Sequence, residues 1–464
     1  MFSKKLIAGL LCLVFVFSAC ATGGGGGAAA PEAPAAPAAP AAPAAPAAPA
    51  ADNDADEDRP ITIVEFWDLT WGPPDFFFPA VDANIDRFNA ENTMGIYVDL
   101  QRIPWDAYTQ VFLTAVAGGA APDASTGGSA RPIGHADMGV GLPLCPIIEQ
   151  WRAENHPILD DFIPGVLDHF NMNGVQWGIP WNMDTRVLFY RRDIFEEAGI
   201  NTYPRTFDEF RDVLRTINQT HPDVIPFTVA LGDAFANTVA ISWLFFNRTP
   251  FADPVQEVGN LTSPEAFQVW DFFTELFDEG LLAPGTGGYR GADVELLYSS
   301  GEVAISMSVP PLWLSGTDMY DVTGILPPIA GPNAINEGTM GTFWVNGIMG
   351  YNVTPHPDET RYFIRWWAEN TLTLFTDGHM GPLPVRSSFY LEPEFSESWI
   401  RSGTYEHYLS GGVPVSWPLP NMYPAFAIIE AEGYHGNVLR SAVTGGDVQA
   451  MAAQMNDLMT QAFE

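Results

Sequence analysis

From about Arg59 onward, short strand patterns alternate with helical patterns, and this alternation restricts the fold more than any other feature of the chain. Residues 60–67 and 96–103 are rich in β-branched residues or alternate in polarity, and they predict strands. Helices are predicted over residues 81–89 and 108–117. Because strands that alternate with helices form mostly parallel sheets, the chain is predicted to be an α/β protein. Such proteins bind ligands at the carboxyl ends of their strands.

The alternation continues through the second half of the chain. A strand is predicted at residues 187–190, followed by a helix at 192–198. Thr206 and Glu209 form a capping box that begins a helix through residue 217. Three further amphipathic helices are predicted, one beginning after Ser263 and two covering residues 359–371 and 448–463.

The first 20 residues have the pattern of a bacterial export signal. Two lysines precede the apolar run 6–17, which is too short to span a bilayer comfortably. Small residues then lead to Cys20, in the manner of a lipobox, so we expect Cys20 to be lipidated. The alternative is an ordinary signal peptide cleaved near Ala21. Residues 21–58 are Gly-rich, then a Pro-Ala-Ala repeat, then acidic, and they predict a disordered, semi-rigid tether.

Charge excludes several classes of partner. The chain has 56 Asp and Glu against 20 Lys and Arg, a net charge of −36. Phosphate backbones and anionic lipid surfaces would be repelled, so neither nucleic-acid binding nor docking through a basic patch is expected. Whether this acidity reflects a saline habitat or only solubility stays open.

Catalytic and metal-binding signatures are also missing from the sequence. Cys145 is the single cysteine after the leader and Cys20, and it is expected to be a small buried side chain. The eight histidines lack the short spacings that zinc sites use, and no G-x-S-x-G motif occurs. We therefore predict no catalytic residue, no metal site and no cofactor.

Five stretches, in order along the chain, carry a family pattern. They are EFWD (65–68), IPWDAY with AGGAAPD (103–108 and 117–123), GIPWNMDTRVLFY with DIFEEAG and PRTFDEF (178–190, 193–199 and 204–210), SGEVAISM with Trp313 (300–307 and 313), and GPLPVR (381–386). With them the chain resembles family 1 extracellular solute-binding proteins, the maltose-binding-protein-like receptors of ABC importers.

The resemblance implies a type II periplasmic-binding-protein fold, with two α/β lobes, three crossovers and a ligand cleft between the lobes. It places residues 59–180 and 322–370 in lobe one. Residues 183–318 and 376–464 would form lobe two.

The resemblance also places particular side chains at the cleft. Sugars need aromatic platforms for their C–H faces, and carboxylates, amides or Arg for their hydroxyls. Asp184 and Arg186 are spaced i, i+2, so on a strand both would point to one face. The alternative for this pair is a structural ion pair, with Trp181 in hinge packing. The candidate ligand-binding residues are Trp67, Asp68, Trp181, Asp184, Arg186, Trp313, Trp344 and Trp417.

By this resemblance, the chain is expected to be a monomeric, lipid-anchored receptor outside the cytoplasm, either in the periplasm or on the outer cell surface. It would capture a sugar or oligosaccharide by hinge closure and deliver it to an ABC-transporter permease. The alternatives are a non-sugar solute, or a ligand-sensing co-receptor of the same fold. A secreted glycosidase is the least favoured alternative. Carboxylate pairs are no evidence for it, because in a chain with so many acidic residues some pair always looks suitable.

Overall fold

The structure, a computed structural model, describes residues 61–105 and 107–464. The predicted leader, the lipidation site Cys20 and the tether 21–58 lie outside the described residues. No helix in the described ranges is long and apolar enough to cross a membrane.

A seven-stranded sheet forms the framework of one half of the molecule. Its strands are β1 (Thr62–Leu69), β2 (Ile96–Ile103), β3 (Ala124–Gly127), β6 (Ile179–Thr185), β13 (Thr342–Gly350), β14 (Leu383–Pro384) and β15 (Val413–Pro414). The order is β14-β6-β13-β3-β1-β2, and β15 pairs with β13. β1, β2 and β3 run parallel, whereas β13 is antiparallel to both β3 and β6. The carboxyl ends of β1, β2, β3 and β6 therefore lie at one edge.

A four-stranded sheet with the order β12-β7-β11-β8 forms the framework of the other half. Its strands are β7 (Val187–Arg191), β8 (Ile225–Val229), β11 (Val303–Ser308) and β12 (Thr323–Leu326). β8 and β11 are parallel, and β7 runs against β11 with Val187 opposite Ser308. Two hairpins lie apart from both sheets, β4 (Asn171–Met172) with β5 (Val175–Gln176) and β9 (Ala252–Asp253) with β10 (Val258–Gly259).

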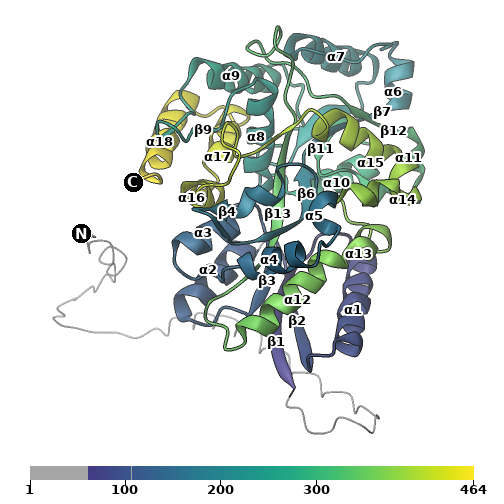
Figure 1. Cartoon of the computed structure of the whole chain (residues 1–464). Coiled ribbons are helices and arrows are strands. Elements are labelled where there is room, and N and C mark those ends of the chain that lie inside the picture. Colours follow the sequence, from purple (N-terminus) through teal and green to yellow (C-terminus); the bar gives the residue numbers. More distant parts are fainter. Residues whose placement is uncertain (1–60, 106) are drawn as a thin grey trace, which may run out of the picture. The chain divides into compact units, whose positions relative to one another are not determined.

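Helices alternate with the strands along the chain (Figure 1). Those before β6 are α1 (Pro74–Glu91), α2 (Tyr108–Gly118), α3 (Arg131–Asp137), α4 (Cys145–Ala153) and α5 (Ile158–Asp161). Those between β7 and β12 are α6 (Arg192–Glu197), α7 (Phe207–Thr220), α8 (Phe235–Phe246), α9 (Pro264–Asp278), α10 (Gly291–Ser299) and α11 (Asp318–Val322). After β13 come α12 (Pro357–Glu369), α13 (Leu372–Thr376), α14 (Pro393–Ser396), α15 (Trp399–Thr404), α16 (Pro424–Glu432), α17 (Tyr434–Ala442) and α18 (Val448–Gln461).

The large sheet carries helices on two faces, and its strands β3, β6 and β13 are buried almost throughout. In β1, Phe66 packs edge-on against Phe363 of α12, whereas its neighbour Trp67 packs against Phe112 of α2. Successive side chains of a strand point to opposite faces, so α12 and α2 cover opposite faces of the large sheet. The α/β class predicted from the sequence is confirmed.

Most predicted elements are confirmed, with one difference near the start of the chain. The N-cap of the predicted capping box is confirmed, because the Thr206 hydroxyl accepts the Glu209 N–H at 3.2 Å at the start of α7. The reciprocal bond differs, since the Glu209 carboxylate accepts from the Arg205 N–H at 2.6 Å and not from the Thr206 N–H. However, the helix predicted over residues 81–89 begins earlier than predicted, because residues 76–78 also belong to α1, which begins at Pro74. Pro79 lies inside this helix, early enough that only its first turns are affected. The Pro- and Gly-rich composition made this segment look irregular.

Strand pairing divides the chain differently from the predicted lobe boundaries. Residues 323–326 were expected in lobe one, but β12 pairs with β7 of the four-stranded sheet. Residues 183–185 were expected in lobe two, but they belong to β6 of the large sheet. The first crossover is therefore Arg186, and the second lies between Leu326 and Thr342. Family-like motifs located the crossovers only approximately, because hydrogen-bond partners are not visible in sequence.

The segment 376–464, predicted to lie in lobe two, is divided between the two sheets. β14 and β15 pair with β6 and β13 of the large sheet, and α16 packs on α3. By contrast, α17 packs on α8, and α18 packs on α17 and β10. The chain therefore crosses between the two halves again after α13 and before α17.

Candidate functional site

The carboxyl edges of the two sheets meet at Arg186. This residue follows the carboxyl end of β6 in the large sheet and precedes Val187, which lies opposite the carboxyl end of β11 in the small sheet. Loops at the carboxyl ends of parallel strands are where α/β sheets bind ligands. The candidate site is therefore the region around Arg186 on which both sets of loops converge.

Arg186 contacts both halves of the molecule. Its Nη1 donates to Asp184 Oδ2 at 2.6 Å, and its Nε donates to Thr238 Oγ1 of α8 at 2.9 Å. The guanidinium lies over the rings of Phe235 on α8 and Trp344 on β13, at 5.0 and 5.5 Å. Asp184 and Trp344 are direct partners in the β6–β13 ladder. A side chain held on both sides in this way links the two halves.

Part of this cluster has unused hydrogen-bonding capacity. Asp184 Oδ1 is buried and has no partner, although the other oxygen is paired with Arg186. The side chains of Arg186 and Asp184 keep only 8% and 16% of their accessible surface. A buried carboxylate oxygen without a donor is costly, and a ligand hydroxyl would satisfy it.

At the large-sheet edge, Asp68 ends a polar chain. Thr126 Oγ1 donates to Asp68 Oδ1 at 2.6 Å and accepts from Leu69 N and Trp71 Nε1 at 3.0 and 3.2 Å. Asp68 is 1% exposed. This burial raises its pKa to about 7, although hydrogen bonds from Thr126 and Trp71 act in the opposite direction.

Aromatic rings stack edge-on beside this chain. Trp71 lies 4.8 Å from Trp105 and 5.3 Å from Trp181, and each pair of ring planes is nearly perpendicular. Trp105 is 41% exposed and donates its Nε1–H to Thr70 O at 2.7 Å. Trp105 is therefore the exposed edge of an aromatic wall, with Trp71 and Trp181 buried behind it.

A second arginine and a glutamate complete the region. Arg131 begins α3, just past the carboxyl end of β3, and its guanidinium stacks on Tyr108 at 4.6 Å. Glu430 on α16 lies close enough to Arg131 and Arg186 for both to lower its pKa. Burial, the largest effect, nevertheless raises the pKa of Glu430 to about 7. A cavity of about 200 Å³ borders Glu430 and Asp233, and in its wall Asn237 Nδ2 is buried without a partner.

The structure places the eight predicted site residues unequally. Asp184, Arg186 and Trp344 are in direct contact, and Asp68 and Trp181 are joined through Trp71. The other three are half-buried and lie further apart along the fold. Trp67 packs on Phe112, Trp313 lies in the turn after β11 against Phe189 and Tyr298, and Trp417 lies 6.3 Å from Phe245 of α8.

Burial separates these residues into two groups. Trp181 and Trp344 are 2% and 3% exposed, and the indole N–H of Trp181 is buried without a partner. Trp313 is half-buried with its indole N–H also unpartnered. The ion pair and hinge packing weighed as alternatives for Asp184 and Trp181 are thus present in the fold. Whether these side chains also contact ligand stays a prediction.

Arg131 and Glu430 were not found by sequence reasoning. Arg131 had a detectable signal, since it follows a strand and a Gly-Gly pair, where a charged side chain reaches the sheet edge. Glu430 had none, because its partners lie about 300 and 240 positions away in the chain and only tertiary packing brings them together. Among the described residues, no group of three or more His, Cys, Asp or Glu is placed to hold a metal ion.

Two α/β halves whose strand ends converge on a polar, aromatic-lined site define a two-lobe ligand-binding protein. The family model for bacterial extracellular solute-binding proteins matches residues 78–371. The chain therefore belongs to the bacterial extracellular solute-binding protein family.

Known proteins agree with this assignment. A putative binding protein of Brucella abortus is 26% identical over 292 residues, which cover 63% of this chain and 67% of the relative. The structure of a sugar transporter from Arthrobacter chlorophenolicus with bound laminaribiose superposes with a TM-score of 0.77 at 20% identity, covering 86% of this chain and 99% of the other. Maltose-bound MalE3 of T. maritima gives a TM-score of 0.71 at 17% identity, with coverages of 86% and 99%. The fold is the two-lobe type II periplasmic-binding-protein fold.

Proposed function

We propose that this chain captures a sugar or oligosaccharide between its two lobes and delivers it to the permease of an ABC importer. The observation that carries the proposal is the position of Arg186 and Asp184 at the meeting point of both sheets' carboxyl edges, where the buried Trp344 ring holds Arg186 in place. Carboxylates and guanidinium groups bind hydroxyls, and indole faces pack on sugar C–H surfaces. The laminaribiose and maltose bound by structural neighbours support the same ligand class.

Within this proposal the candidate residues have different roles. Trp313 provides an aromatic platform from the small-sheet lobe. Asp184 and Arg186 bind adjacent hydroxyls, with the free Asp184 Oδ1 accepting a hydrogen bond. Asp68, Trp67 and Trp417 contribute at the periphery of the site. Trp181 and Trp344 are nearly fully buried, so they act by holding Trp71 and Arg186 in place.

Arg131 and Glu430 join these residues as ligand contacts. α16 packs on α3, and the charges of Arg131 and Arg186 both act to lower the pKa of Glu430. A neutral solute is favoured over an anion, because a chain with a net charge of −36 repels anions from solution.

The mechanism is closure about the crossovers. A ligand that touches both lobes binds the closed form better and shifts the population toward it by that difference in affinity. The closed form is then recognised by the permease. Lipidation at Cys20 holds the monomeric protein on the outer side of a membrane, with residues 21–58 as a spacer, and no chemical step is performed on the ligand.

The test is a thermal-shift screen of the purified protein against mono- and oligosaccharides, sugar phosphates, amino acids and polyamines, at low and high salt. A ligand at about 100 times its Kd stabilises the fold by about 2.7 kcal/mol, a shift of several degrees. We expect one group of sugars to give this shift and to be recovered unchanged. A shift with a charged solute and none with any sugar would overturn the carbohydrate assignment.

A further inference from the structure

A second cavity, of about 270 Å³, lies away from Arg186, beside the segment that follows β14. This volume is close to the lower limit of about 300 Å³ for small-molecule pockets. Its walls come from the turn after β14, from α14 and α15, from the π-helical turn Tyr405–Leu409 and from Ile163. The residues that the argument uses are Ser387, Tyr390, Phe395, Arg401, Ser402 and Tyr405.

One wall of this cavity is fastened to the large-sheet lobe. Arg386 pairs with Asp161 of α5 at 2.8 Å, and Ser388 donates both its N–H and its hydroxyl to the same carboxylate. Ile163 donates its backbone N–H to Val385 O at 2.9 Å. The turn that carries Ser387 therefore moves with the large-sheet lobe.

The opposite wall is fastened to the small-sheet lobe. Trp399 at the start of α15 lies under the Arg192 guanidinium at 5.1 Å and packs against Tyr320 of α11. α15 also packs on β12. A molecule in the cavity would thus contact elements attached to both lobes.

Arg401 is a buried cation at this cavity. It is 4% exposed. Its Nη1 and Nη2 donate to the carbonyl oxygens of Glu394 and Phe375 at 3.2 and 2.5 Å, and its Nε is buried without a partner. Within the described residues no carboxylate forms an ion pair with it. Burial lowers its pKa to about 10, so the side chain stays charged at neutral pH.

An uncompensated charge in a protein interior is costly unless an anion accompanies it. The remaining guanidinium N–H groups and the hydroxyl of Ser387 are donors suited to a carboxylate, whereas the Ser402 hydroxyl already donates to Ser398 O at 2.7 Å. The rings of Tyr390 and Tyr405, 4.9 Å apart, and of Phe395, 5.6 Å from Tyr390, form an apolar surface beside them. Such rings favour a carboxylate that carries an apolar body over an inorganic ion.

We propose that this cavity is a second ligand site, which binds a small organic carboxylate through the remaining N–H groups of Arg401, with the rings of Tyr390 and Tyr405 against its apolar body. The Phe395 ring lies directly against the Arg401 guanidinium, at 4.3 Å, and holds it in place. The site is separate from the candidate sugar site, because it lies beside α14 and α15 and none of its lining residues belongs to the candidate sugar site. Since its walls belong to different lobes, occupancy also biases the hinge. Only this last consequence rests on the proposed sugar-binding function.

The test uses sodium benzoate as the probe, by isothermal titration calorimetry on the whole protein, with sodium chloride added to keep ionic strength constant. We expect saturable 1:1 binding. Ser402→Trp fills the cavity from an exposed position and should weaken benzoate binding by about tenfold or more, while Ser410→Trp, exposed in the following turn and outside the cavity, should not. Arg401→Gln should also weaken it, and circular dichroism checks that this variant is folded.

Three outcomes would overturn the proposal: no saturable benzoate binding, equal binding by wild type and Ser402→Trp, or saturable binding of inorganic phosphate in place of benzoate. If Arg401→Gln does not fold, the Ser402→Trp and Ser410→Trp pair decides. The hinge consequence is measured separately as a change in sugar affinity with and without benzoate. Failure of the sugar screen would leave the benzoate result unaffected.

Discussion

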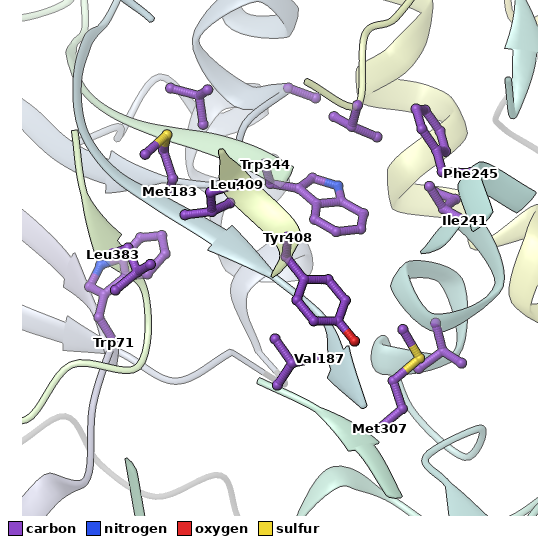
Figure 2. Packing of buried hydrophobic residues seen from close by; sticks show 14 of the residues in the cluster. Trp71, Met183, Val187, Ile241, Phe245, Met307, Trp344, Leu383, Tyr408 and Leu409 are labelled. Atoms are coloured by element: carbon purple, nitrogen blue, oxygen red, sulfur yellow. The ribbon is translucent and has the colours of Figure 1, made fainter. Parts of the chain in front are cut away.

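The hydroxyl of Tyr408 accepts a hydrogen bond from the backbone N–H of Leu188 at 2.9 Å. The same hydroxyl donates to the carbonyl of Leu326 at 2.8 Å. Leu188 lies just after the first crossover and Leu326 just before the second, so one side chain holds the two crossovers together. Figure 2 shows Tyr408 in the same buried cluster as Val187 and Trp344. The backbone of Tyr408 also approaches Gly341 so closely that a Cβ there would lie 2.4 Å from its carbonyl oxygen.

Tyr408→Phe should destabilise the protein by about 1–3 kcal/mol, because it leaves a buried N–H and a buried carbonyl without a partner. Urea unfolding followed by circular dichroism measures this change. Tyr97→Phe is the control, since Tyr97 is 39% exposed, and its stability should stay near that of wild type. Equal stability of the two variants would show that the Tyr408 hydroxyl does not hold the crossovers.

Arg186→Met should abolish ligand binding and reduce the free energy of unfolding by about 3 kcal/mol, because it leaves the Asp184 carboxylate buried without its cation. Arg215→Met is matched to it, since Arg215 also pairs with carboxylates but its side chain is 41% exposed. The control should change stability by less than about 1 kcal/mol and leave affinity unaltered. Ligand binding that survives Arg186→Met would contradict the position given to this residue.

Asp68 should make the protein less stable as the pH rises. Burial raises its pKa from 3.8 to about 7, so between these values the folded state binds a proton that the unfolded state has released. The contribution of protonated Asp68 to the free energy of unfolding is therefore fully present below about pH 4. This contribution, up to about 4 kcal/mol, is lost as the pH rises toward 7. Asp68→Asn should remove this part of the pH dependence.

The measurement for Asp68 is chemical denaturation of wild type and variant at pH 5 and pH 8. Asp271→Asn, at an exposed position of α9, controls for the loss of one charge and should leave the wild-type pH dependence in place. An Asp68→Asn variant that loses as much stability as wild type between the two pH values would show that Asp68 is not the group responsible.

Trp313→Ala should weaken sugar binding by about tenfold or more, because an aromatic platform contributes about 1–3 kcal/mol to a stacked ligand. Trp399→Ala is the matched control, a half-buried tryptophan on α15 outside the candidate sugar site. Trp399→Ala should lower the melting temperature yet preserve sugar affinity, as calorimetry would show. If the two variants lose affinity equally, Trp313 acts through the fold and not through the ligand.

Residues 96–103 illustrate what could be predicted from sequence. Their alternating polarity predicted a strand, and β2 has those bounds. Asp184 and Arg186 were likewise singled out together, and they form an ion pair of 2.6 Å. Local periodicity and short spacings suffice for such features, because the interacting groups lie within a few residues of one another.

The lobe boundaries show the opposite case. Residues 323–326 carry a strand pattern that fits either sheet, and only pairing with β7 decides between them. The burial of a side chain is equally hard to predict. Trp181 and Trp313 are both aromatic residues beside strands, yet Trp181 is 2% exposed and Trp313 is half-buried. Sequence does not distinguish a ring that a ligand can reach from one enclosed by other rings, because the enclosing residues come from distant segments.

The sequence by itself determined the α/β class and the family pattern, since each depends on composition or on local order. The export leader and the absence of nucleic-acid partners stay predictions from the same sequence. The tertiary structure decided which side chains meet. Glu430 lies near enough to Arg131 and Arg186 for their charges to lower its pKa, and Tyr408 joins Leu188 to Leu326, across separations that no local pattern records. The physical reason is that long-range contacts are selected by the packing of whole sheets and helices, which fixes distances between residues that are remote in the chain.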